Sequence, residues 1–385
     1  MTNRAVELVL VVLLTLLSAV VAFAQSPTPA DAISLEQQGK FPEAAQAWKA
    51  VTERNPTDAA ALASLGVVLS KEQKYSEAAA AYRKALALNP KLPGVQLNLG
   101  LAEFKQSRFQ PAAAAFRRAL AADSTNSQAR TLLGLSNYGA QQFADAVKYL
   151  EPAAKADPGN TELHTVLAQS CLWAKNYPCA LEEFRHLLQQ NPNSPATHVL
   201  LGEALDGESQ TADAIAEFEA AAKISPSEPN VHFGLGYLHW KSQQYDQARQ
   251  EFQRELTLDP NHAQSLAYLG DIEWKANHPD EALSFLQRSL TIQKNLRIVY
   301  VDLGAIDLQQ KKYKDAQSAL LKAISLDPDL PDAHYQLGRL YQALGKTADA
   351  EKELHRVQEL HKKAEDSLVG KINSSPPAYD PSEAK

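Results

Sequence analysis

The hydrophobic pattern of residues 59–92 predicts two helices that pack against each other. Apolar or aromatic side chains recur every three or four residues in both halves of this segment: Leu62, Leu65, Leu69, Tyr75, Ala78, Tyr82, Ala85 and Leu88. This spacing places them on one face of a helix, whereas the residues of a strand would alternate between two faces. Pro90 ends the second helix, because proline lacks the amide hydrogen of the helical ladder. The segment therefore predicts a helix-turn-helix module.

The module recurs with a period of 34 residues, and no insertion interrupts the register. When the module is numbered from 1 to 34, position 20 is alanine in every copy: Ala44, Ala78, Ala112, Ala146, Ala180, Ala214, Ala248, Ala282, Ala316 and Ala350. Position 8 is small in every copy: Ala32, Gly66, Gly100, Gly134, Ala168, Gly202, Gly236, Gly270, Gly304 and Gly338. Since small side chains let two backbones approach closely, each copy is expected to form an antiparallel helical hairpin.

A 34-residue helix-turn-helix with these small residues resembles the tetratricopeptide repeat family. The resemblance implies an all-α fold, a right-handed superhelical solenoid of about ten 34-residue helix-turn-helix repeats. It covers residues 25–364, with repeats starting near 25, 59, 93, 127, 161, 195, 229, 263, 297 and 331. The resemblance also implies a concave face that binds other polypeptides.

Residues 1–24 differ from everything that follows them. Arg4 precedes an apolar run that ends in Ala22-Phe23-Ala24, a pattern typical of a secretory signal peptide cleaved before Gln25. We therefore expect a periplasmic or secreted protein. The alternative is an uncleaved membrane anchor, since residues 8–24 carry no charge and are marginally long enough to span a bilayer. A membrane would be a partner only in that case.

Residues 365–385 follow the last repeat and are expected to contain the end of a charged helix and then a tail. The charged helix would cover the open end of the solenoid, as a terminal repeat must. From about Gly370 the sequence is polar and includes Pro376 and Pro377, which predicts a disordered tail.

The sequence contains no recognisable catalytic motif. It has no His-Glu-x-x-His, Gly-x-Ser-x-Gly or Cys-x-x-Cys pattern and no glycine-rich phosphate loop. The repeats leave no room for a separate catalytic domain. A formal net charge of -7 without a basic stripe argues against a nucleic-acid partner. We therefore predict a non-enzymatic protein without a cofactor.

Histidines recur at position 4 of four repeats, which raises the question of a metal site. They are His164, His198, His232 and His334. Position 4 is elsewhere a packing position. Equivalent side chains of adjacent repeats in a solenoid are also too far apart to share one metal ion at bond lengths of about 2.1 Å. We therefore interpret these histidines as packing residues and predict no metal. Glu255 occupies position 27, where most copies have a small or apolar residue. One interpretation is that its carboxylate marks a functional site. The favoured interpretation is that the aliphatic part of the side chain packs against the protein while the carboxylate reaches water.

The two cysteines, Cys171 and Cys179, lie at positions 11 and 19 of one repeat, on opposite arms of its hairpin. An oxidising compartment would favour a disulfide between them. A bridge requires a Cα separation of about 4.4–6.8 Å, and position 19 could instead face outward. The sequence leaves both states open.

The most unusual surface is a stripe along the first helices of the repeats. By the family resemblance, positions 5, 9 and 12 of these helices face the concave side. The predicted partner-binding residues lie on or beside this stripe: Leu97, Leu101, Phe104, Leu135, Tyr138, Leu172, Trp173, Phe233, Tyr237, Trp240 and Trp274. Large exposed apolar patches usually mark interaction surfaces. The alternative is that neighbouring first helices bury part of the stripe.

Two functions fit this pattern. The favoured one is a non-enzymatic protein-interaction scaffold of the cell envelope or extracellular space, which binds an extended peptide or helix in an aromatic concave groove. The alternative is a carrier for a small molecule or glycan that stacks on Trp240 and Trp274. A peptide groove should be open over several repeats, whereas a carrier needs a closed pocket.

The mature protein is expected to begin at Gln25, because Ala22 and Ala24 stand where signal peptidase requires small residues. Intact-mass spectrometry of the native protein should show this start. Recovery of the uncut N-terminus in a membrane fraction would overturn the expectation.

Overall fold

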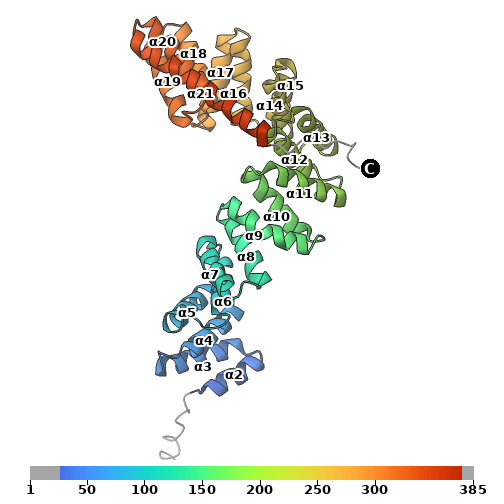
Figure 1. Cartoon of the computed structure of the whole chain (residues 1–385), viewed down its shortest axis with the longest axis vertical. Helices are drawn as coiled ribbons and strands as arrows, with labels where there is room; N and C mark the ends of the chain where they lie inside the picture. The colour runs from blue at the N-terminus through green and yellow to red at the C-terminus, as the bar shows by residue number, and fades with distance from the viewer. Residues whose placement is uncertain (1–26, 375–385) are drawn as a thin grey trace, which may run out of the picture. The chain divides into compact units, whose positions relative to one another are not determined.

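The computed structural model describes residues 27–374, which form twenty α-helices and no strand. Figure 1 shows each first helix followed by a second helix that runs back beside it. Contacts divide the chain into two compact units, Met1–Glu183 and Phe184–Lys385. The all-α repeat architecture expected from the sequence is confirmed. The predicted signal peptide, residues 1–24, lies outside the described residues.

The helices alternate along the chain as the two arms of successive hairpins. The first helices are α2 (Pro29–Gln37), α4 (Ala59–Lys71), α6 (Val95–Phe104), α8 (Ser127–Gly139), α10 (Thr161–Trp173), α12 (Pro195–Gly207), α14 (Val231–Lys241), α16 (Ala263–Lys275), α18 (Arg297–Gln309) and α20 (Pro331–Ala343). The second helices are α3 (Phe41–Arg54), α5 (Tyr75–Leu88), α7 (Phe109–Ala122), α9 (Phe143–Ala156), α11 (Tyr177–Gln190), α13 (Thr211–Ile224), α15 (Tyr245–Leu258), α17 (Pro279–Ile292), α19 (Tyr313–Leu326) and α21 (Thr347–Ser374). Among the described residues, no helix is both long enough and apolar enough to cross a bilayer.

Besides α2, two first helices begin later than the expected starts of their repeats. α6 begins at Val95 and α14 at Val231, two residues after the expected repeat starts at 93 and 229. In each case the preceding residue adopts a left-handed backbone, Gly94 with φ 74° and Asn230 with φ 64°. Glycine and asparagine tolerate this conformation better than other residues. Neither Gly94 nor Asn230 caps its helix with a side-chain hydrogen bond.

Close packing within each hairpin rests on the residue at position 8. A Cβ atom added at Gly66 would lie 2.5 Å from the Tyr82 ring, and one at Gly100 would lie 2.5 Å from the Phe116 ring. Tyr82 and Phe116 occupy position 24 of their repeats. The alanines at position 20 are also buried in every hairpin. The small residue at position 8 therefore makes room for the large side chain at position 24.

The turn between the two helices of a hairpin places position 15 in the left-handed region. Gly39 and Gly345 occupy it in the first and last repeats, and other residues occupy it elsewhere: Gln73, Ser107, Gln141, Lys175, Ser209, Gln243, Asn277 and Lys311. The turn is closed by backbone bonds such as Lys74 N to Leu69 O at 2.9 Å. The sequence did not reveal this conformation, because no glycine marks it in eight of the ten repeats.

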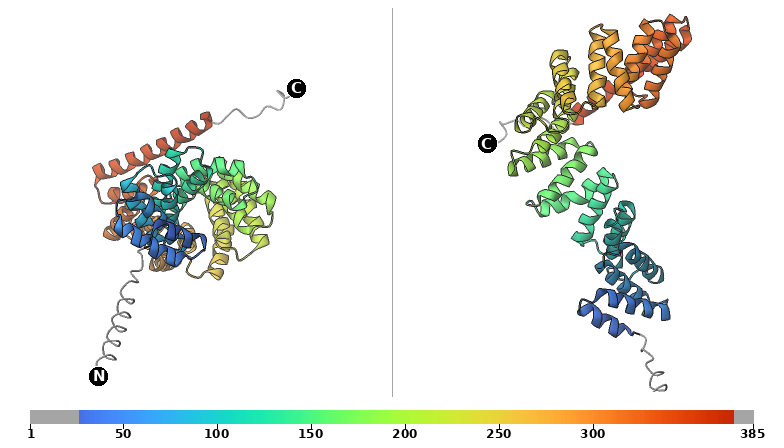
Figure 2. Two further views of the ribbon diagram at one scale, coloured as in Figure 1. Left: turned by 90° about the horizontal axis from the view of Figure 1, so that it is seen from below. Right: turned by 180° about the vertical axis from the view of Figure 1, so that it is seen from behind.

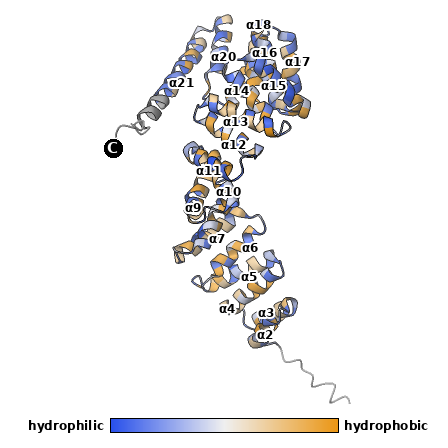
Figure 3. Ribbon diagram, turned by 90° about the vertical axis from the view of Figure 1, so that its right-hand side faces the viewer, coloured by the Kyte–Doolittle hydropathy of each residue, from blue (hydrophilic) through white to orange (hydrophobic). Residues whose placement is uncertain are grey.

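The last helix is longer than expected. α21 spans 28 residues against 13 in α20, and Figure 2 shows it as one continuous helix. Much of it is hydrophilic in Figure 3, with Leu360 among its few buried residues. The expected start of a tail near Gly370 is wrong for residues 370–374, which continue the helix because no proline interrupts residues 347–375. Residues 375–385 lie outside the described part.

Substituting Gly66 by alanine is expected to destabilise the first unit. Tyr82 is fully buried and leaves no space for the added methyl group. Overpacking costs about 1–3 kcal/mol, which exceeds the roughly 1 kcal/mol of helix propensity that alanine gains over glycine. Urea unfolding followed by circular dichroism should therefore show a lower midpoint. Gly159→Ala is the control, because no atom lies within 4 Å of its Cβ position. Equal midpoints for the two variants would contradict this packing.

Candidate partner-binding surface

Four aromatic rings from α14 and α16 pack together in the second unit. Phe233, Tyr237 and Trp240 come from the predicted stripe on α14, and Tyr268 comes from α16. The ring centroid of Tyr268 lies 4.8 Å from Trp240, 5.7 Å from Tyr237 and 6.1 Å from Phe233. All four side chains are half-buried. We call these four residues the aromatic cluster.

Sequence reasoning identified three members of the aromatic cluster and missed Tyr268. Tyr268 stands at position 6 of its repeat, one residue beyond the stripe at position 5, where Ala267 is fully buried. The only signal in the sequence was its aromatic character. Its contact with Trp240 joins residues of neighbouring repeats, which the pattern within one repeat does not reveal.

A buried carboxylate fixes the position of Trp240. The indole Nε1 donates to Asp271 Oδ2 at 2.5 Å, and Lys275 Nζ donates to the same oxygen at 2.5 Å. Lys275 also lies 4.7 Å from the centroid of the Trp240 ring, a cation–π contact. Asp271 is only 4% exposed. Trp240 is therefore held rigidly, and its N–H is already used within the protein.

A second aspartate lies beside Asp271. Asp302 of α18 is buried, and burial raises its pKa well above the usual range. The negative charge of Asp271 acts in the same direction, and the protonated Asp302 hydrogen-bonds to Asp271. Lys275 opposes this shift in part. Burial beside Asp271 therefore favours the protonated form of Asp302, since two neighbouring buried carboxylates disfavour a double negative charge.

A small acidic cavity adjoins the aromatic cluster. It has a volume of about 160 Å³, and its walls include Phe233 and Tyr237 together with Glu203 and Asp206 of α12. Asp206 accepts a hydrogen bond from Lys241 Nζ at 2.7 Å. Glu203 remains exposed, although partial loss of water raises its pKa. Carboxylates beside aromatic faces can accommodate a cationic group.

Glu255 has a structural role that neither sequence interpretation anticipated. Its Oε2 accepts a hydrogen bond from the backbone N–H of Phe233 at 3.1 Å, and the residue is buried. The carboxylate therefore caps the N-terminus of α14, which lacks a cap from Asn230. The expectation that its head reaches water is wrong, because this amide gives the buried oxygen a partner. The bond also fixes Phe233 in the aromatic cluster.

A smaller aromatic group lies in the first unit. Tyr138 of α8 stacks on Trp173 of α10 with centroids 5.7 Å apart, and Phe143 lies 5.0 Å from Trp173. The Tyr138 hydroxyl donates to Gln169 Oε1 at 2.6 Å. Trp173 is 47% exposed, more than any other tryptophan or phenylalanine among residues 27–366.

Other residues of the predicted stripe contribute to packing. Leu97, Leu101 and Phe104 are half-buried against the core around Phe116. Leu135 is also half-buried. Leu172 is only 7% exposed, so its assignment to a partner-binding surface is corrected. The physical reason is its place on the helix: the next residue, Trp173, points about 100° further round and reaches solvent.

Trp274 belongs to a different environment from Trp240. It is half-buried and packs against the core formed by Ala267, Leu286 and Ile306. The sequence places both tryptophans at position 12 of their repeats, on the same predicted stripe. Trp240 instead joins the aromatic cluster, and Trp274 supports the packing of α16 on α17 and α18. The alternative interpretation, partial burial by neighbouring helices, therefore describes Trp274 better.

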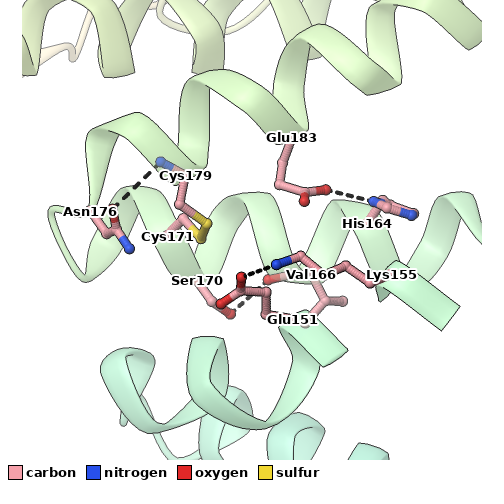
Figure 4. The surroundings of a disulfide bond; sticks show 9 residues. All are labelled: Glu151, Lys155, His164, Val166, Ser170, Cys171, Asn176, Cys179 and Glu183. Atoms are coloured by element: carbon pink, nitrogen blue, oxygen red, sulfur yellow. Dashed lines mark hydrogen bonds and ion pairs between the residues drawn. A yellow bond between two sulfur atoms is a disulfide. The ribbon is translucent and has the colours of Figure 1, made fainter. Parts of the chain in front are cut away.

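The two cysteines form a disulfide in this structure. Figure 4 shows Cys171 of α10 and Cys179 of α11 joined across the hairpin. Their Cα atoms lie 5.7 Å apart, within the range that a bridge requires. Cys171 is fully buried, whereas Cys179 is half-buried. The bridge ties the two arms of one hairpin near its turn.

The position-4 histidines each contact a glutamate nineteen residues later. The pairs, joined through Nδ1, are His164 with Glu183, His198 with Glu217, His232 with Glu251, and His334 with Glu353. In three of these repeats Nε2 faces the carbonyl of the preceding proline, as between His232 and Pro226 at 3.0 Å. No group of three potential metal ligands occurs among the residues that the structure describes. The histidines therefore join the two helices of a hairpin to the preceding loop.

Comparison with known families identifies the repeats. Models described as tetratricopeptide repeat match residues 30–93, 70–127, 97–161, 138–204, 228–295 and 332–364, and one described as TPR repeat matches residues 304–345. These matches extend over most of the chain. The comparison with curated proteins found no match.

Several solved structures resemble parts of the chain. A MamA fragment from Desulfovibrio magneticus is 18% identical, with 44% of this chain and 96% of that chain aligned at a TM-score of 0.39. A chain of the APC/C hetero-tetramer Cut9-Hcn1 is 13% identical over 88% of both chains, with a TM-score of 0.48. YrrB, a TPR protein with an unusual peptide-binding site, is 20% identical over 50% of this chain and 100% of its own, with a TM-score of 0.36. Similarity at this level carries no information about a partner.

The Asp302 side chain is expected to make stability fall as pH rises. Burial and the charge of Asp271 raise the pKa of Asp302 in the folded state, so the folded protein holds this proton to higher pH than the unfolded chain, where the pKa is about 3.9. Stability therefore decreases between the unfolded and the folded pKa, by about 1.4 kcal/mol per unit of difference. Asp302→Asn cannot ionise and should unfold at a higher midpoint than the wild type at neutral pH.

Thermal unfolding from about pH 4 to pH 8 would measure this effect. Asp315→Asn serves as the control, because Asp315 is exposed. An Asp302→Asn variant with a lower midpoint throughout and an unchanged pH slope would show that Asp302 is ionised in the folded protein.

Proposed function

Because the chain belongs to the tetratricopeptide repeat family, we propose that it is a non-enzymatic scaffold that binds an extended peptide or helix along the first helices of its repeats. Tetratricopeptide repeats generally serve as protein-interaction modules. The proposed binding surface in the second unit is the aromatic cluster with its acidic cavity. Trp173 and Tyr138 would supply a second contact area in the first unit.

The observation that carries this proposal is the rigid placement of the aromatic cluster. Trp240 is held by Asp271 and Lys275, and Phe233 is held through its amide by Glu255. Pre-ordered aromatic side chains lose little conformational entropy when a partner binds, and tyrosine and tryptophan are enriched at binding hot spots. All four rings keep part of their surface accessible.

The adjoining cavity suggests the chemistry of one partner residue. At about 160 Å³ it has room for one side chain, and Glu203 and Asp206 make its rim acidic. Glu203 has no ion pair among the described residues. A lysine or arginine of the partner would place its charge near Glu203 and its stem against the faces of Phe233 and Tyr237.

The size of this cavity favours a peptide over a small-molecule ligand. Sites for small molecules usually measure about 300–1,000 Å³ and enclose most of the ligand. A glycan carrier would need such a pocket beside Trp240 and Trp274. These two tryptophans instead pack within separate groups of side chains.

We place the scaffold in the cell envelope or the extracellular space. The apolar run of residues 1–24 supports export, and an uncleaved run would anchor the protein in the membrane. The bridge between Cys171 and Cys179 also supports this placement, because disulfides persist in oxidising compartments.

Truncating the aromatic cluster should weaken binding to a captured partner. Affinity capture from an envelope extract would supply the partner, and calorimetry would measure its affinity for each variant. Tyr237→Ala is expected to cost about 2 kcal/mol, roughly a thirtyfold loss in affinity. Glu203→Gln should cost about tenfold if a basic residue is bound.

Glu208→Gln is the matched control, because Glu208 is exposed at the end of the same helix and does not line the cavity. Melting temperatures of all three variants would separate binding from folding. If Tyr237→Ala and Glu203→Gln stay folded and bind the partner as the wild type does, this surface is not the binding site.

A further inference from the structure

A larger cavity opens in the first unit, at an edge formed by three helices. It has a volume of about 1000 Å³ and lies between the C-terminal ends of α5 and α7, the loop of residues 89–94 and the start of α6. Its apolar walls include Leu86, Leu92, Pro93, Leu97, Ala119 and Ala122. We call this cavity the edge cleft. Only Leu97 among these residues belongs to the predicted stripe, so the edge cleft is a different surface from the first-helix stripe.

The late start of α6 shapes the edge cleft. The loop of residues 89–94 continues through Pro93 and Gly94, two residues beyond the expected start of the repeat, and Gly94 is left-handed there. Pro90, Lys91, Leu92 and Pro93 of this loop line the cleft. Gly94 and Gln96 also line it. The positive end of the helix dipole therefore meets the cleft without a capping side chain from Gly94.

The charged side chains at the edge cleft leave an excess of positive charge. Arg83 and Arg108 share the carboxylate of Glu103, and Asp123 is the one acidic residue that lines the cleft. Lys91 and Arg118 line the cleft from different elements, and neither side chain has an ion pair among residues 27–366. With the single carboxylate of Asp123 in the same lining, these cations leave a net positive charge, which favours a negatively charged ligand.

The positions of the two unpaired cations narrow the chemistry further. Lys91 comes from the loop of residues 89–94 and Arg118 from α7, so a ligand that pairs with both needs two separate negative charges. A fatty acid offers a single carboxylate. A peptide offers carboxylates at more than one point, with apolar side chains between them.

We propose that the edge cleft binds a short acidic and apolar peptide segment of a partner protein. An aspartate or glutamate of the segment pairs with Arg118, and a second one pairs with Lys91. An apolar side chain between them packs on Leu86, Leu92 and Leu97. This site does not depend on the function proposed for the second unit, because it differs in position and in the charge of its ligand.

Binding of a pool of fluorescein-labelled hexapeptides to the mature protein would test the proposal. The pool carries aspartate or glutamate at its ends and leucine or phenylalanine between them, and a second pool replaces the acids by asparagine and glutamine. Fluorescence anisotropy should show binding of the acidic pool and at least a tenfold weaker affinity for the amide pool. Higher salt should weaken the binding, because exposed charges are screened.

Arg118→Glu should lower the affinity for the acidic pool at least tenfold, whereas Arg117→Glu should leave it unchanged. Arg117 is the adjacent exposed arginine on α7 and does not line the cleft. Circular dichroism would confirm that both variants are folded.

Three results would overturn the proposal. The first is that the acidic pool does not bind at about 1 mM protein. The second is an equal loss of affinity in the Arg117→Glu and Arg118→Glu variants, and the third is equal affinity of the wild type for the acidic and amide pools. Laurate that binds in the cleft while the acidic pool does not would assign it to a fatty acid instead.

Discussion

The contact between positions 8 and 24 of each repeat is the constraint on which the whole structure depends. In most hairpins a large side chain of the second helix lies against the bare Cα of a glycine in the first, as Phe252 lies against Gly236 and Leu320 against Gly304. An added Cβ would approach these side chains to 2.7 Å or less. Since the helices must come this close, position 20 also remains alanine, and successive hairpins share one geometry.

A repeated core leaves the chain free to vary elsewhere, and both candidate sites arise from such variation. In α14 aromatic residues fill positions 5, 9 and 12, and Asp271 and Glu255 hold them in place. In α6 a late helix start leaves the edge cleft open. Both helices follow a residue in the left-handed conformation, so the same local change of backbone accompanies both departures from the common pattern.

Buried carboxylates connect neighbouring repeats and the candidate surface. Asp271 accepts hydrogen bonds from Trp240 and Lys275, and burial favours the protonated form of Asp302 beside it. Burying such groups is costly unless they are hydrogen-bonded. Beside the aromatic cluster, these carboxylates hold side chains of the candidate surface in fixed positions, and their burial lowers the free energy of unfolding.

The sequence by itself determined the period, the helices and the packing of each hairpin, because these depend on residues within one 34-residue module. It also identified Phe233, Tyr237 and Trp240, whose shared helix face follows from their spacing. Tyr268, Glu255 and Asp302 required the tertiary structure, since their partners lie in other helices. The edge cleft likewise depends on how α5, α6 and α7 meet around one loop, and that arrangement follows from packing between repeats rather than from any local pattern.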